Sequence, residues 1–129
     1  MYPCFSKEEA LAVISVVIDI ALADNRLDPN EDQFVGVLAT KMGLSKLEVR
    51  YAQKLQPNVV APTLSRMTYD KRKLVTFMLL ATSAVDGFSS RTELAAVMMI
   101  CANCNLVNPN DLEVSPERVA REVKKWLDS

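Results

Sequence analysis

SKEEALAVISVVIDIA, residues 6–21, is the stretch of sequence that decides the fold class. Ser6 and Glu9 form a capping-box pattern, in which the serine hydroxyl accepts an early helix amide and the glutamate reaches back to the amide of Ser6. Apolar residues then recur at helical spacing, at Ala10, Val13, Ile14, Val17, Ile18 and Ala21. The stretch therefore predicts a capped helix with one buried face.

Outward from this helix, the chain alternates helix-start signals with further apolar faces. The predicted starts are Asp28-Pro29, Ser45, about Tyr69, Ser90 and Ser115-Pro116. Gly43 can end the second helix in a left-handed conformation. Val59-Val60-Ala61 is the only strand candidate and has no partner run, and Pro57 and Pro62 bracket a connection with room for one short helical turn. We expect an all-α fold, a compact bundle of about six or seven short helices.

Length and composition predict one folded domain over residues 1–129 and exclude several function classes. Half of the residues are hydrophobic, which is enough to fill a core. The 15 basic and 16 acidic side chains nearly cancel, so no nucleic-acid partner is expected. Histidine is absent, which removes histidine-based catalysis and the commonest zinc ligand. The protein is predicted not to be an enzyme.

The cysteines predict a reducing compartment. Cys4, Cys101 and Cys104 are three in number, so a fully paired disulfide framework is impossible and a cytoplasmic location is expected. Cys101 and Cys104 have C-x-x-C spacing, which suggests either a dithiol or simple packing; their apolar helical surroundings favour packing. The apolar run 11–23 is too short to span a bilayer and contains Asp19, so no direct membrane insertion is expected.

Two segments of the chain align at a constant shift of 62 residues. Asp24 to Glu31 corresponds to Asp86 to Glu93, and the same shift pairs apolar residues of the helices that follow: Val35 with Val97, Leu38 with Ile100, and Leu44 with Leu106. The alignment predicts an internal helix-loop-helix pseudo-repeat. The acidic loops are not EF-hands, because counting from Asp24 places Arg26 at the third position, where calcium needs an oxygen ligand.

Packing of two such units would bring Asp24, Glu31, Asp86 and Glu93 together, with Asp28 close by. Carboxylates this close repel one another, and a hard divalent cation relieves the repulsion. Oxygen ligands without histidine favour calcium, magnesium or manganese over zinc. The same residues have a second interpretation, because Glu31 and Glu93 stand at the third helical position, where glutamate caps a helix. The sequence leaves both interpretations open.

The same loops carry a family resemblance. Ala21-Leu-Ala-Asp24-Asn25 with Glu31, Ser83-Ala-Val-Asp86-Gly87 with Glu93, and the stretch from Ala39 to Ser45 resemble the tellurite-resistance TerB-like family between Ser6 and Leu106. The resemblance implies about seven helices, no known catalysis and clustered acidic residues that bind divalent cations. It also implies a role in stress responses such as tellurite resistance, with partner proteins near the membrane. Asn25 departs from the family's usual glycine, although asparagine also adopts positive φ readily.

The sequence therefore predicts one function and leaves an alternative of a different class open. The first is a non-enzymatic, TerB-like cation-binding helical domain that acts as a stress-response adaptor for protein partners, some of them membrane-associated. The alternative is a plain protein–protein interaction module whose acidic loops only cap helices. The metal ligands of the first hypothesis are Asp24, Glu31, Asp86 and Glu93.

Overall fold

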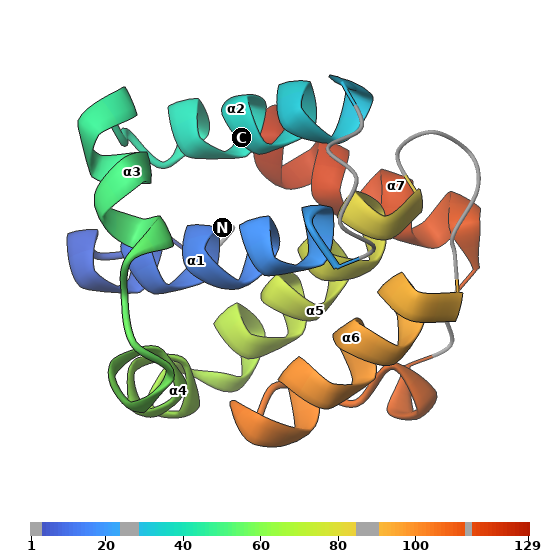
Figure 1. The fold of residues 1–129 in the computed structure, drawn as a ribbon. Helices are drawn as coiled ribbons and strands as arrows, with labels where there is room; N and C mark the ends of the chain where they lie inside the picture. Colours follow the sequence, from blue (N-terminus) through green and yellow to red (C-terminus); the bar gives the residue numbers. More distant parts are fainter. Residues whose placement is uncertain (1–3, 24–28, 85–90, 113–114) are drawn as a thin grey trace.

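The computed structural model describes residues 4–23, 29–84, 91–112 and 115–129. Within these ranges the chain is all-α, with seven α-helices, one short 3-10 helix and no strand (Figure 1). The elements are α1 (Lys7–Ala21), α2 (Pro29–Lys41), α3 (Lys46–Gln53), α4 (Pro57–Ser65), α5 (Tyr69–Ala84), α6 (Arg91–Asn103), η1 (Pro109–Asp111) and α7 (Pro116–Leu127). The predicted fold class is confirmed.

Serine caps set the starts of three helices. The Ser6 hydroxyl accepts the amide of Glu9 at 3.2 Å, and the Glu9 carboxylate accepts the amide of Ser6 at 2.8 Å, so the predicted capping box is present. Ser45 forms the same box with Glu48. Ser115 caps α7 by accepting the amide of Arg118. Each cap satisfies an amide that the helix itself cannot, which contributes about 1 kcal/mol.

Helix α1 is the central element of the bundle. Ten of its fifteen residues are buried, because it packs against α2, α3, α4, α5 and α6. Its run of valine and isoleucine leaves almost no polar face, as expected of a helix surrounded by others. Each fully buried Val or Ile contributes about 1.5–3 kcal/mol of transfer free energy. The stretch that decides the fold class therefore also supplies the middle of the core.

The structure differs from the predicted secondary structure at residues 57–65, which form helix α4. The sequence suggested a connection with one short turn, whereas the structure forms a nine-residue helix with Pro57 at its first position and Pro62 inside it. Val60 and Leu64 are buried one helical turn apart, and α4 packs on α1. The strand candidate Val59-Val60-Ala61 lies within this helix. Burial of the apolar face outweighs the hydrogen bond that Pro62 removes.

The helices follow the predicted 62-residue register. Helix α5 begins 62 residues after α1, and α6 begins and ends 62 residues after α2. The ends of α2 and α6 also have the same hydrogen bond. The amide of Leu44 donates to the carbonyl of Ala39 at 2.9 Å, and the amide of Leu106 donates to the carbonyl of Cys101 at 2.9 Å. The residues before these leucines have positive φ, 76° at Gly43 and 54° at Asn105. The two halves thus end their second helix with the same backbone motif.

The repeat extends to the fourth helix of each half. Helices α4 and α7 both have proline at their first position, and they pack on α1 and α5 respectively. A shift of 59 residues relates the buried Val60 and Leu64 to Val119 and Val123. In the second half, the short η1 stands where the first half has α3. The described chain is therefore two related halves, of which the second is shortened between its second and fourth helices.

Glu9 and Lys71 join the two halves at equivalent positions. They lie 62 residues apart, and Lys71 Nζ is 2.8 Å from Glu9 Oε1. A residue that contacts its own counterpart lies at the axis relating two repeats. This ion pair therefore marks the pseudo-two-fold axis, where α1 packs against α5.

None of the described helices is long and apolar enough to cross a membrane.

Candidate functional site

The structure describes two of the four predicted metal ligands. Glu31 lies at the third position of α2 and Glu93 at the third position of α6. Asp24 and Asp86 lie outside the described residues, as do Asp28, Asn25 and Gly87. The predicted meeting of all four carboxylates therefore stays a prediction. Figure 1 shows α2 and α6 starting toward the same side of the molecule.

Glu31 and Glu93 are the most deeply buried acidic side chains among the described residues. They are 3% and 4% exposed, and one carboxylate oxygen of each, Oε2, is out of contact with solvent. Glutamate is almost never this buried unless its charge is compensated. Both lie in the first turn of a helix, where free amides and the helix dipole favour a negative charge. The position of Glu31 and Glu93 in a first helical turn can supply part of that compensation.

Two other described glutamates cap helices from the third position and serve as a comparison. Glu9 and Glu48 also stand at the third helical position and complete capping boxes. Their side chains are 19% and 34% exposed, and each also pairs with a lysine, Glu9 with Lys71 and Glu48 with Lys7 at 2.7 Å. Capping at this position therefore does not require burial. Glu31 and Glu93 form a separate class that shares a position in the repeat and a much lower exposure.

The pKa values of the capping glutamates follow from these contacts. Burial opposes ionisation of Glu9, but hydrogen bonds from Lys71 and the backbone of Ser6 outweigh it and lower the pKa. The hydrogen bond from Lys7 is the main reason why the pKa of Glu48 is lowered. Asp19, near the end of α1, behaves in the opposite way, because desolvation raises the pKa of its carboxyl group. It lies close enough to Cys104 to affect that thiol.

The C-x-x-C pair is packed in the core. Cys101 in α6 and Cys104 directly after its end are both buried, and all three cysteines are free thiols. Burial raises the pKa of Cys101 to about 11, and burial and the nearby Asp19 also raise that of Cys104. Since metal binding and thiol redox chemistry require the thiolate, these surroundings disfavour both. The packing interpretation of the pair is supported.

The described residues alone do not form a metal centre. Within the described ranges, no group of three or more cysteine, aspartate or glutamate side chains is placed to hold a metal ion. Glu31 and Glu93 would therefore need further oxygen ligands from the acidic residues of the adjoining loops. The described helices contribute at most a buried carboxylate from each half.

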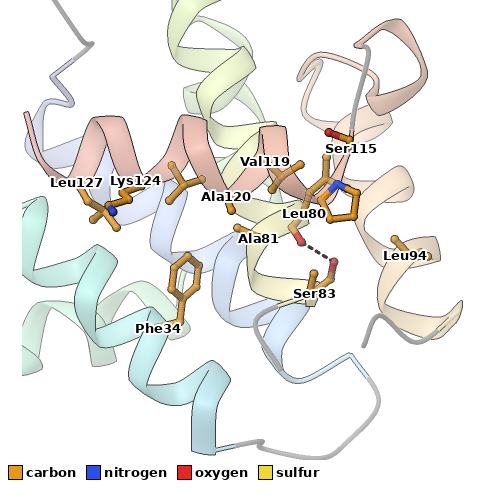
Figure 2. Close-up of a pocket in the computed structure, with 13 residues that line it drawn as sticks. Phe34, Leu80, Ala81, Ser83, Leu94, Ser115, Val119, Ala120, Lys124 and Leu127 are labelled. Atoms are coloured by element: carbon orange, nitrogen blue, oxygen red, sulfur yellow. Dashed lines mark hydrogen bonds between the residues drawn. The ribbon is translucent and has the colours of Figure 1, made fainter. Parts of the chain in front are cut away.

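A groove on the surface was not predicted from the sequence. It has a volume of about 530 Å³ and lies between α7 and parts of α2, α5 and α6 (Figure 2). Its walls are mainly apolar and include Phe34, Leu80, Val119 and Val123. These four apolar residues fit the apolar pattern of their own helices, so nothing in the sequence distinguishes an apolar residue that lines a groove from one that fills the core.

Comparisons with known proteins support the fold and the resemblance. Residues 2–54, which include α1, α2 and α3, match the family model described as tellurite resistance protein TerB. A crystal structure of a protein of unknown function from Porphyromonas gingivalis W83 superposes with a TM-score of 0.76 at 20% sequence identity. The alignment covers 95% of this chain and 98% of that one, so the likeness shows a shared fold over nearly the whole length. No curated protein matches the chain.

Proposed function

We propose, from the premise that this chain is a TerB-like helical domain, that it binds a divalent cation between its two acidic loops and acts as a non-enzymatic adaptor. One observation carries the proposal: Glu31 and Glu93 are buried at the same position of two related halves. Four described glutamates lie at the third position of a helix, and of these only Glu31 and Glu93 are almost fully buried. The contrast with Glu9 and Glu48 favours a role beyond capping.

The physical argument concerns the cost of burial. A carboxylate removed from water loses solvation that one helix dipole restores only in part. A hard cation bound by oxygen ligands restores more, because its full charge lies in direct contact with the carboxylate. Asp24 and Asp86 are the loop residues that would add a second ligand from each half. Calcium, magnesium and manganese suit such an all-oxygen site.

The adaptor role has indirect support. The chain has no histidine, and its two buried thiols are shifted away from the reactive thiolate form. The free cysteines fit a cytoplasmic location, which stays a prediction. The matched family is described by tellurite resistance, so we propose a stress-response setting with protein partners, including membrane-associated ones.

Cation titration of the full chain followed by heteronuclear NMR and calorimetry tests the cation site. We expect calcium, magnesium or manganese to shift the amide signals of both loops together, with one binding event. Glu31→Gln and Glu93→Gln should each weaken binding about tenfold or more, since each removes a charged ligand. Glu48→Gln is the matched control, because it changes a third-position glutamate that caps a helix at the surface, and its affinity should equal that of the parent.

Two results would reject the cation site. Absence of localised shifts with all three cations would leave Glu31 and Glu93 as buried helix caps. Equal binding by Glu31→Gln, Glu93→Gln and Glu48→Gln would place any bound cation elsewhere. Either result would leave the interaction module as the remaining function.

A further inference from the structure

The groove beside α7 has the shape of a site for an extended molecule. One face of α7 lines it from end to end, through Pro116, Val119, Ala120, Val123, Lys124 and Leu127. These residues span the whole helix, which at ~1.5 Å per residue is roughly 16 Å long. Phe34 of α2 and Leu80 of α5 stand across from them, and Figure 2 shows Lys124 and Leu127 at one end and Leu94 at the other. The volume of about 530 Å³ falls within the range of ~300–1,000 Å³ typical of small-molecule sites.

The polar groups of the described lining are few, and the two serines are engaged. The Ser83 hydroxyl donates to the carbonyl of Leu80 at 2.8 Å, and the Ser115 hydroxyl caps α7. The walls therefore offer a ligand mostly carbon surface. An apolar groove of this kind does not hold ordered water well, and apolar ligand atoms gain the contacts that its walls otherwise lack.

Lys124 is the one charged side chain among the described residues of the lining. Its ammonium group makes no hydrogen bond or ion pair with any other described residue. An amphipathic lysine at the end of an apolar groove places its methylene stem on the groove and its charge at the rim. The groove thus presents a long apolar surface with a single cation at one end.

We propose that this groove binds a single-chain amphiphile with an anionic head, of the class of medium-chain fatty acids. The alkyl chain lies along α7 between Phe34 and Val119, and the carboxylate meets Lys124. The charge complementarity favours this ligand over a partner helix or a second copy, because a fatty acid has one anion at the end of an otherwise apolar chain. The proposal does not rest on the proposed cation site, since neither Glu31 nor Glu93 is among the described residues of the groove lining.

Dodecanoate, used below its micellar concentration with the full chain, tests the proposal by calorimetry and NMR. We expect saturable binding of one dodecanoate per chain, with shifts along α7 and at Phe34. Lys124→Gln should weaken dodecanoate binding about three- to tenfold, as expected for a partly exposed charge pair. The affinity for the uncharged 1-dodecanol should be unchanged in this variant. Lys125→Gln is the matched control, since the neighbouring lysine does not line the groove, and it should bind both ligands like the parent.

A second variant tests the position of the alkyl chain. Ala120 is exposed and lines the groove, so Ala120→Trp should fill it and abolish binding of both dodecanoate and dodecanol. Ala102→Trp, at an exposed position of α6 away from the groove, is the control and should bind normally. Circular dichroism of each variant should remain that of the parent.

Several outcomes would overturn the proposal. These are no saturable binding by the parent chain, equal binding by Ala120→Trp, or an equal loss of dodecanoate affinity in Lys124→Gln and Lys125→Gln. Self-association of the parent that Ala120→Trp abolishes, without dodecanoate binding, would assign the groove to a second copy of the chain. Binding of an amphipathic helical peptide in place of dodecanoate would assign it to a partner protein.

Discussion

Gly43 and Asn105 show how single residues determine where helices end. Both have positive φ, and both precede a leucine whose amide turns back to a helix carbonyl. Glycine adopts this conformation without steric cost, and asparagine is among the few other residues that adopt it readily. The two residues are 62 positions apart, so they do the same task in the two halves.

Substitutions at these two positions should have different effects on stability. Gly43→Ala should lower the free energy of unfolding by about 1 kcal/mol, because alanine is strained at φ 76°. No atom lies within 4 Å of the position of an added Cβ, so the cost comes from the backbone alone. Asn105→Gly should leave stability unchanged or raise it by a few tenths of a kcal/mol, because it relieves the residual strain.

Urea denaturation of both variants measures this difference. Gly36→Ala is the control, since an added Cβ there also meets nothing within 4 Å and the residue lies in the middle of α2 at helical φ. It should gain stability from higher helix propensity. A loss in Gly36→Ala equal to that in Gly43→Ala would argue against the backbone explanation.

The sequence predicted one of these helix ends and not the other. Gly43 was identifiable because glycine after an apolar helical run is a common stop signal. Asn105 carried no such signal by itself, although the alignment of Leu44 with Leu106 places it opposite Gly43. At the candidate cation site, residue type and spacing identified Glu31 and Glu93, but their burial depends on helices distant in sequence and could not be predicted locally.

At the scale of elements, α4 departs most from its sequence signals. The local sequence predicted a connection between Pro57 and Pro62, because proline inside a helix removes a backbone hydrogen bond. The structure forms the helix because Val60 and Leu64 gain burial against α1, which no local pattern reveals. The start of the long helix α5, by contrast, was predicted at about Tyr69, where the helix begins in the structure.

Replacing the internal proline of α4 should stabilise the protein. Pro62 is exposed, so Pro62→Ala removes little buried surface while it restores an amide that can donate to the carbonyl of Asn58. We expect the free energy of unfolding to rise by about 1 kcal/mol, since the gain in helix hydrogen bonding exceeds the loss of unfolded-state restriction. Thermal and urea denaturation measure the change.

Pro57→Ala is the matched control for this substitution. Pro57 occupies the first position of the same helix, where a missing amide costs nothing and proline is favoured. Its replacement should leave stability unchanged or lower it slightly. If Pro62→Ala proved less stable than Pro57→Ala, the internal proline would be supporting α4 and not weakening it.

For the whole molecule, the contact between the two halves is held in part by the Glu9–Lys71 pair. The two side chains are 19% and 22% exposed, so solvent screens the pair only partly. A double-mutant cycle with Glu9→Gln and Lys71→Met should give a coupling energy of about 1 kcal/mol at neutral pH. The exposed Lys7–Glu48 pair should give a smaller coupling energy in the same experiment.

The coupling should depend on pH with a definite sign. Because the folded-state pKa of Glu9 is lowered from its usual 4.5, the stabilisation is fully present above the unfolded-state pKa. It should disappear as the pH falls through the lower folded-state pKa. Urea denaturation at a series of pH values from neutral to strongly acidic measures this; a coupling energy that stayed constant across the series would contradict the ion-pair explanation.

The Glu9–Lys71 pair also favours one way of associating the two halves. If two identical halves packed about an exact two-fold axis, the position on that axis would hold the same residue in both halves. Two copies of the first half would therefore place glutamate against glutamate. Self-pairing of the second half would set lysine against lysine, and like charges in contact repel. Only the combination of one half with the other places opposite charges there, as Glu9 and Lys71 do. The charge difference at this one position therefore favours contact between the unlike halves over contact between two like halves.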